Sequence, residues 1–272
     1  MDVFEVEPAT DNILFGHENV VCTPHLGAAT TEAQVNVALQ VAEQMSDYLV
    51  NGAVTNALNM ASISAEDAPR LKPYLKLAEQ LGSFAGQITT TAIKKIEIEY
   101  EGTITDVNTD PITSTLLAKL LGEQTESVNM VNAMQVSQAK GIELKQSYND
   151  ESKNRRSMIN VVVTSEERSR YVTGSLFTGK EPRIVNIEGV PIEVALQPNM
   201  IFIRNDDQPG MIGDLGTLLG EENLNIADFR LGRKDDKSGA ICIVALDAPV
   251  NDDVFEKIRS QKQIVSVKRL SF

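Results

Sequence analysis

The sequence has 272 residues, enough for two domains of about 100 to 200 residues each or for three smaller ones. Its composition of 42% hydrophobic and 23% charged residues, with no apolar run of about 18 residues, excludes a disordered chain and a membrane-spanning one. The formal net charge of −13 disfavours nucleic acid and anionic membranes as partners.

The first predicted element is a short apolar strand at residues 19–23, which runs directly into the sequence Pro-His-Leu-Gly at 24–27. No earlier element is available to pair with it, and an isolated strand is not stable. We therefore expect the rest of its sheet to lie in another chain, or in natural sequence upstream of Met1.

Two helices are predicted next. Thr31 and Gln34 stand at the spacing of a capping box, an apolar stripe runs over 35–49, and Gly52 is placed to end the helix. A second apolar stripe at helical spacing predicts a helix over 65–86, in which Pro73 marks a kink or the first turn. We expect the two helices to pack on each other or on a second copy of the chain.

The pattern then changes to strict alternation of apolar and acidic residues over 96–101, typical of a half-buried strand. Helices are predicted over 112–121 and 127–139. Further strands are predicted over 158–164, 171–177, 183–187 and 191–196. Because strands and helices segregate, this part predicts an α+β domain of about 100 residues.

The last 75 or so residues give the clearest pattern in the chain. Strands are predicted over 200–204, 225–231, 240–246 and 264–270, with helices over 211–220 and 252–260. The order βαββαβ predicts a ferredoxin-like sheet backed by two helices. The predicted fold class of the whole chain is therefore α+β.

His25 is the first candidate for chemistry, because an imidazole in a turn after a strand can move a proton near neutral pH. The alternative is a histidine that only makes structural hydrogen bonds. Cys22 and Cys242 are the only cysteines, and with two histidines they are too few for a zinc or iron–sulfur site. We expect no metal, reduced thiols and a cytoplasmic location.

The turn at 204–210 is the second candidate. Free amides at the start of the following helix favour an anion, and Asp207 can hold an ammonium group, so the turn suits an amino acid zwitterion. Asn205 belongs to the same turn, and Asn225, at the start of the next strand, adds an amide. The alternative is an Asx turn that only caps the helix.

Three basic clusters form a third candidate, either as an anion site or as ion-pair partners at strand ends. They are Lys94 with Lys95, Lys153 with Arg155 and Arg156, and Lys180 with Arg183.

Two spaced motifs, Asp-Val-Phe-Glu-Val-Glu-Pro at 2–8 and Asn-Val-Val-Cys-Thr-Pro-His-Leu-Gly-Ala-Ala-Thr at 19–30, closely resemble the D-isomer-specific 2-hydroxyacid dehydrogenases. The long tail resembles the branch of that family that carries an intervening domain and an ACT domain. The resemblance implies the remnant of a Rossmann-type nucleotide-binding domain at 1–30, helices of the substrate-domain return and linker at 31–92, an intervening, allosteric substrate-binding type domain at 93–197 and an ACT domain at 198–272.

The resemblance further implies NAD-dependent oxidation of 3-phosphoglycerate in serine biosynthesis, with His25 as the proton acceptor. Asp2 and the backbone of His25, Leu26, Gly27 and Ala28 would lie at the nicotinamide end of the cofactor. L-serine would bind as feedback effector between two subunits, at Asn205, Asp207 and Asn225. A homodimer or homotetramer assembled through the intervening and ACT domains is implied.

The family's glycine-rich dinucleotide loop, its catalytic arginine and the glutamate that orients its histidine are all expected upstream of Met1. We therefore expect the chain alone to bind no NAD and to be inactive. One alternative is a stand-alone amino-acid-sensing ACT module that acts through a partner protein. Another is the accessory part of an iron–sulfur L-serine dehydratase, which the two cysteines disfavour.

Overall fold

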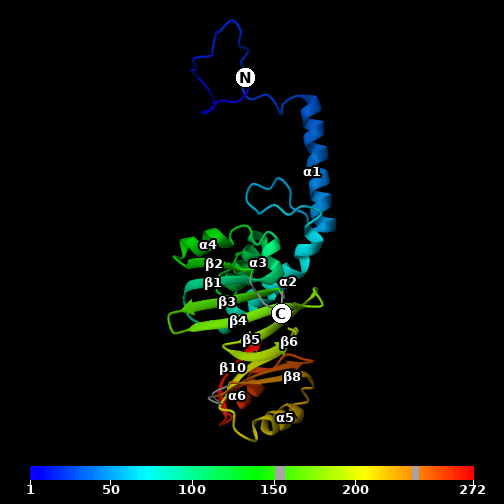
Figure 1. Ribbon diagram of the computed structural model, residues 1–272, viewed down its shortest axis with the longest axis vertical. Helices are drawn as coiled ribbons and strands as arrows, with labels where there is room; N and C mark the ends of the chain where they lie inside the picture. Colours follow the sequence, from blue (N-terminus) through cyan, green and yellow to red (C-terminus); the bar gives the residue numbers. More distant parts are fainter. Residues whose placement is uncertain (151–156, 235–238) are drawn as a thin grey trace. The chain divides into compact units, whose positions relative to one another are not determined.

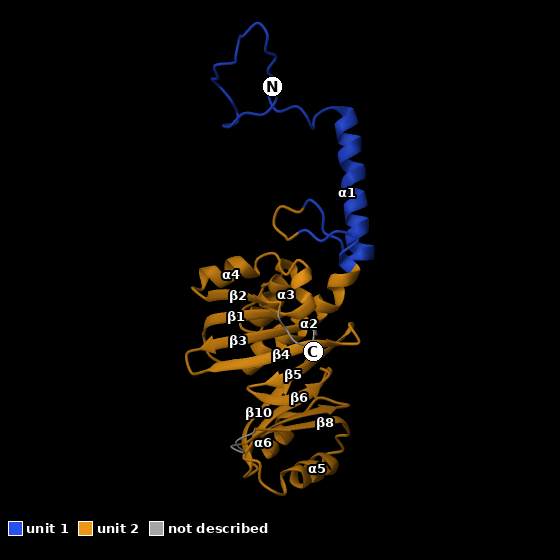
Figure 2. Ribbon diagram, viewed as in Figure 1, with its two compact units in different colours: residues 1–56, 62–68 blue, residues 57–61, 69–272 orange. Residues whose placement is uncertain are grey.

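The computed structural model describes residues 1–150, 157–234 and 239–272, so the predicted basic cluster of Lys153, Arg155 and Arg156 lies outside the described residues. Contacts divide the chain into two units, shown in different colours in Figure 2. The first comprises residues 1–56 and 62–68, and the second comprises residues 57–61 and 69–272. No helix in the described parts of the chain is long and apolar enough to cross a membrane.

The segment before residue 31 contains no regular helix or strand, so the predicted strand at 19–23 is wrong. Residues 19–25 lie beside the start of the chain. The amino group of Met1 donates to the Val21 carbonyl (2.6 Å), and the Thr23 and His25 amides donate to the Met1 and Asp2 carbonyls (3.0 Å each). These bonds hold the two segments side by side but do not build the continuous ladder that a strand needs.

Helix α1 spans Thr31–Asn51 and ends, as predicted, at Gly52, whose φ of 74° suits a left-handed cap. The capping-box prediction is wrong by one residue, because Thr30 is the N-cap and its hydroxyl accepts from the Ala33 amide (3.1 Å). No residue of α1 is buried, so the apolar stripe over 35–49 is exposed.

The second unit contains a six-stranded sheet in the order β2-β1-β3-β4-β5-β6 (Figure 1). Its strands are β1 Ile93–Glu101, β2 Glu143–Asn149, β3 Met158–Ser165, β4 Ser169–Phe177, β5 Glu181–Ile187 and β6 Val190–Val194. Only β1 and β2 are parallel, joined by the 3₁₀ turn η1 Gly102–Asp106 and the helices α3 Asp110–Gly122 and α4 Ala133–Ala139. Helix α4 is shorter than the helix predicted over 127–139, and strand β2 was not predicted.

One face of this sheet carries the core. Ile96, Ile98 and Tyr100 of β1 are buried, as the alternation predicted, and the Tyr100 hydroxyl bonds Thr113 of α3 (2.7 Å). Burial is also the main cause that raises the pKa of Tyr100. Helix α2, Ala68–Ile88 with Pro73 inside it, covers the same core and buries Leu81.

Close packing between α2 and its neighbours depends on glycines. A Cβ atom on Gly82 would lie 2.3 Å from the Leu116 carbonyl oxygen of α3. A Cβ atom on Gly174 of β4 would lie 2.6 Å from a methyl carbon of Leu77 in α2. Helix α2 therefore fits against both α3 and the sheet only because these positions have no side chain.

The C-terminal domain has the predicted βαββαβ order and the sheet order β10-β7-β9-β8. Its elements are β7 Met200–Asn205, α5 Met211–Glu221, β8 Ile226–Arg233, β9 Ala240–Leu246, α6 Asp252–Arg259 and β10 Ile264–Leu270. Both helices lie against one face, where Ile203, Leu215 and Ile258 belong to a common apolar core. Every residue of β9 is buried, which fits a central strand covered on both sides.

Within the second unit, the other face of the β7 strand meets the intervening part of the chain. The Phe202 ring lies edge-on to Phe84 of α2, with 5.8 Å between centroids. Arg204 forms an ion pair with Glu188, and the Gln87 side chain bonds the Ser271 backbone (2.8 and 2.9 Å). The two sheets therefore share a packed junction with apolar and charged contacts.

Candidate functional site

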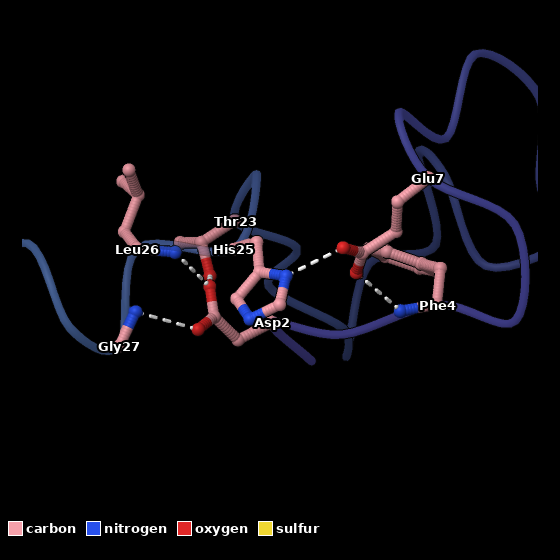
Figure 3. A network of polar contacts seen from close by, with 7 residues as sticks. All are labelled: Asp2, Phe4, Glu7, Thr23, His25, Leu26 and Gly27. Atoms are coloured by element: carbon pink, nitrogen blue, oxygen red, sulfur yellow. Dashed lines mark hydrogen bonds and ion pairs between the residues drawn. The ribbon is translucent and has the colours of Figure 1, made fainter. Parts of the chain in front are cut away.

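Asp2 organises the turn around His25 in the first unit (Figure 3). Its carboxylate accepts from the Thr23 hydroxyl (2.6 Å) and from the Leu26 and Gly27 amides (2.7 Å each). The Thr23 bond, followed by the Leu26 bond, lowers the pKa of Asp2. A charged carboxylate with three donors holds this turn in place.

His25 and Glu7 form a hydrogen-bonded pair in the same segment. His25 has φ of 54°, and its Nδ1 lies 2.5 Å from Glu7 Oε2, while Glu7 Oε1 accepts from the Phe4 amide (2.9 Å). The bond and charge of Glu7 raise the pKa of His25. The Phe4 amide and then His25 lower the pKa of Glu7.

Glu7 corrects the sequence analysis, which expected the glutamate that orients the histidine to lie upstream of Met1. The carboxylate on Nδ1 fixes the imidazole orientation and directs Nε2 away from this pair. Nε2 makes no hydrogen bond within the described residues, so it is the nitrogen through which a proton could be exchanged. The available signal was the Glu-Pro pair within the motif at 2–8.

A cavity of about 610 Å³ adjoins the pair, a volume within the range of small-molecule sites. Its wall is mostly apolar, and the Phe4 and Phe15 rings meet edge-on with centroids 5.4 Å apart. The lining residues are Phe4, Glu7, Pro8, Ala9, Phe15, Cys22, Thr23, Pro24 and His25. The geometry places the hydrogen-bonded pair of His25 and Glu7 at the wall of an apolar pocket.

The predicted cofactor residues do not form a dinucleotide site by themselves. The Leu26 and Gly27 amides already donate to Asp2, and Ala28 is exposed in the turn. A Cβ atom on Gly27 would lie 3.0 Å from Asp2 Oδ2, so this glycine serves the close approach of Asp2. The sequence also contains no glycine-rich phosphate loop, so the residues present do not fit NAD.

The second candidate site begins with an Asx turn, the alternative considered for residues 204–210. Asn205 Oδ1 accepts from the Asp207 amide (2.9 Å), and Asp207 has φ of 55°. Asn205 is 3% exposed, and its Nδ2 has no hydrogen-bond partner within the described residues. Helix α5 then begins after Gly210 without a side-chain cap. The turn therefore combines a buried donor with free helix amides.

Arg233 is a further residue of this site that sequence reasoning missed. Its Nε and Nη2 lie 2.8 and 2.5 Å from Asp207 Oδ2. The Asp207 side chain is 13% exposed, whereas that of Arg233 is 59% exposed. The Asp207 carboxylate can bind a cation, and in this structure it binds Arg233.

Asn225 lies away from this turn within one chain. It precedes β8, whereas Arg233 is the last residue of β8, so the strand separates them by roughly 26 Å at about 3.3 Å per residue. Asn225 Nδ2 donates instead to Asp247 Oδ2 (2.7 Å). The structure thus brings Asn205 and Asp207 together and leaves Asn225 at the opposite end of the sheet.

The described members of the basic clusters mostly have carboxylate partners. Lys94 pairs with Glu166, Lys95 with Glu97 and Glu143, and Arg183 with Glu181. These pairs favour the ion-pair interpretation of the clusters. No group of three or more metal-ligating side chains is found in the part of the chain that the structure describes.

Comparison with known proteins identifies two domains. Residues 70–188 match the D-3-phosphoglycerate dehydrogenase intervening domain, and residues 199–263 match the ACT domain. Proteins named D-3-phosphoglycerate dehydrogenase from Bacillus subtilis and Synechocystis are each 35% identical to this chain, over 98% and 95% of its length. A protein of the same name from Archaeoglobus fulgidus is 34% identical over 97% of the chain. The chain spans about half the length of these relatives, with 51%, 47% and 51% of them covered.

Proposed function

We propose that this chain is the regulatory C-terminal part of an NAD-dependent 3-phosphoglycerate dehydrogenase of serine biosynthesis. The proposal rests on the order of its domains, because an intervening domain of the D-3-phosphoglycerate dehydrogenase type is followed by an ACT domain. L-serine is its feedback effector, and the intervening and ACT domains assemble the enzyme as a homodimer or homotetramer. A cytoplasmic location, which suits two free cysteines, is part of the proposal.

The observation that carries the effector assignment is the turn of Asn205 and Asp207. The Nδ2 of Asn205, which has no hydrogen-bond partner among the described residues, and the amides at the start of α5 suit a carboxylate, and Asp207 suits an ammonium group. An L-amino acid offers both charges on one carbon atom. Binding requires the ammonium group to replace Arg233 at the Asp207 carboxylate.

The position of Asn225 supports a site shared by two chains. One chain supplies Asn205 and Asp207, and the Asn225 that completes the site comes from a second copy of the chain. Within a single chain, Asn225 and the turn of Asn205 and Asp207 lie at opposite ends of β8. A symmetric pairing of two such domains creates two equivalent sites.

In the whole enzyme, His25 is the proton acceptor for the substrate hydroxyl. Glu7 holds the ring by Nδ1 and stabilises the imidazolium that forms, while Nε2 faces the substrate. NAD binding belongs to the whole enzyme, since the residues of this chain do not form its site. We expect no NADH production by this chain alone with 3-phosphoglycerate, and measurable turnover would contradict this part of the proposal.

Isothermal titration of the chain with L-serine, with glycine and D-serine as controls, tests the effector assignment. We expect saturable binding selective for L-serine, weakened at least about tenfold in both Asp207→Ala and Asn225→Ala. Asp228→Ala is a matched control, because it removes a β8 carboxylate that pairs with Arg230 instead. No binding by a chain whose oligomeric mass shows association would reject L-serine as the effector.

A further inference from the structure

Asp247 lies beside Asn225, at the end of the C-terminal sheet opposite to Asp207. The Asn225 side-chain amide donates to Asp247 Oδ2 (2.7 Å), and the Asp247 backbone amide donates to the Asn225 carbonyl (3.2 Å). These two bonds fix the carboxylate next to the amide. Asp247 is exposed, and its carboxylate forms no ion pair with the residues that the structure describes. The end of the sheet that carries Asn225 therefore also carries a negative charge that is available to a cation.

Arg233 is a cation that can leave its present partner. Its Nε and Nη2 both reach the same oxygen of Asp207, so the pair uses two of the five donors of the guanidinium. The Arg233 side chain is 59% exposed, whereas that of Asp207 is 13% exposed. Arg233 can therefore rotate into solvent while Asp207 stays in the turn. An ammonium group that binds Asp207 sets this guanidinium free at the edge of the site.

The proposed site between two chains, on which this inference rests, brings a second carboxylate to the same place. If Asn225 of a second copy completes the site, the bonds between Asn225 and Asp247 place the Asp247 carboxylate of that copy there as well. Two carboxylates at one site repel each other unless cations neutralise them. The empty site has one cation, Arg233, for Asp207 and Asp247. The occupied site has two, because the ligand adds its ammonium group.

We propose that Arg233 exchanges carboxylates when an amino acid binds, from Asp207 of its own chain to Asp247 of the second copy. The ammonium group of the ligand takes over Asp207, and the released guanidinium forms an ion pair across the interface. Each carboxylate then has its own cation. Because the bound state has an additional contact between chains, ligand binding and association of the chains strengthen each other.

The exchange can be tested without a ligand. Asp207→Asn removes the charge that holds Arg233 and keeps the side-chain shape. By sedimentation equilibrium we expect its dimer to dissociate with a Kd about fivefold lower than that of the wild type. Adding Asp247→Asn or Arg233→Met to this chain is expected to abolish the gain. Asp228→Asn is the matched control, because it removes a β8 charge that pairs with Arg230 instead, and its Kd should equal that of the wild type.

Calorimetric titration with L-serine tests the same exchange in the presence of a ligand. Asp247→Asn is expected to weaken L-serine binding about fivefold in the wild-type chain and less than about twofold in Arg233→Met. If Asp247 served only to position Asn225, or attracted the ammonium group directly, its loss would weaken binding equally in both chains. Equal losses would therefore overturn the exchange.

The two experiments separate this inference from the proposed function. A dimer Kd that is unchanged in Asp207→Asn, or a chain that stays monomeric in every variant, overturns the exchange, whether or not L-serine binds. Absence of L-serine binding, together with a gain in Asp207→Asn that depends on Arg233 and Asp247, rejects L-serine as the effector. That result supports the exchange for a different ligand with an ammonium group.

Discussion

His25 and Glu7 are linked by a hydrogen bond between the imidazole Nδ1 and the carboxylate. Glu7 raises the pKa of His25 above the ordinary value of 6.5, so the folded chain keeps the proton to a higher pH than the unfolded chain does. The stabilisation from this pair is complete below pH 6.5 and is lost as the pH rises through the raised pKa. The local fold around the pair therefore loosens as the pH rises through the raised pKa of His25.

Replacing the glutamate tests this dependence. In Glu7→Gln we expect the pKa of His25 to fall, because the negative charge beside Nδ1 is gone while the side-chain shape is kept. The measurement is an NMR titration of the imidazole resonances. The His17 resonances serve as an internal control for changes elsewhere in the segment. An unchanged His25 titration would mean that Glu7 does not contact the ring.

Sequence patterns locate His25 and the Asn205–Asp207 turn, but not their partners. A turn has a local signature, in which Asn, Asp, Pro and Gly follow one another. Glu7 and Arg233 reach their partners across 18 and 26 residues, respectively, with no periodicity that links them. Such pairs are set by the folding of the intervening chain, which local patterns do not encode.

At the level of elements, helix α2 crosses α3 so closely that two glycines of α2 face backbone carbonyls of α3. A Cβ atom added to Gly82 would lie 2.3 Å from the Leu116 carbonyl oxygen, and one added to Gly86 would lie 2.7 Å from the Leu120 carbonyl oxygen. A backbone oxygen cannot move aside as a side chain can. The two helices would have to separate to accept a methyl group at either glycine.

Gly82→Ala is therefore expected to lower the free energy of unfolding by about 1–3 kcal/mol, measured by urea denaturation. Gly216→Ala in α5 is the matched control, because a Cβ atom there meets nothing within 4 Å. This control is expected to raise the free energy of unfolding by about 0.5–1 kcal/mol, since alanine restricts the unfolded chain and favours helix. Equal effects of the two substitutions would show that α2 and α3 do not cross at Gly82.

The elements that the sequence predicts well are those with a buried face. The residues of β1 alternate between buried and more accessible positions, and its apolar side chains reveal this. In contrast, β2 lies at the edge of the sheet and has no fully buried residue, so its polar side chains carry no alternating signal. Its place is determined by backbone pairing in register with β1, from Lys95 with Glu143 to Glu101 with Asn149.

For the whole molecule, the order of the domains follows from the sequence more readily than their contacts do. The βαββαβ order of residues 200–270 and its ferredoxin-like sheet were predicted in full. The junction between the sheets was not, because Phe84 and Phe202 are more than 100 residues apart in the chain and each shows only as an ordinary apolar position.

The separation of Asn225 from Asp207 along β8 also predicts how L-serine binds to hybrids of two different variant chains. With a site made by two copies, an Asp207→Ala chain still offers an intact Asn225, and an Asn225→Ala chain still offers an intact Asp207. A hybrid of the two variants regains one complete site, although neither variant has one alone.

Random pairing in an equal mixture makes half of the dimers hybrid, so the bound L-serine should return to about one quarter of the wild-type stoichiometry. Calorimetry on the two variants refolded together measures this recovery, and each variant refolded alone is the control. A mixture that stays silent would place all the ligand contacts within a single chain. Recovery would make the effector a reporter of which chains have exchanged partners.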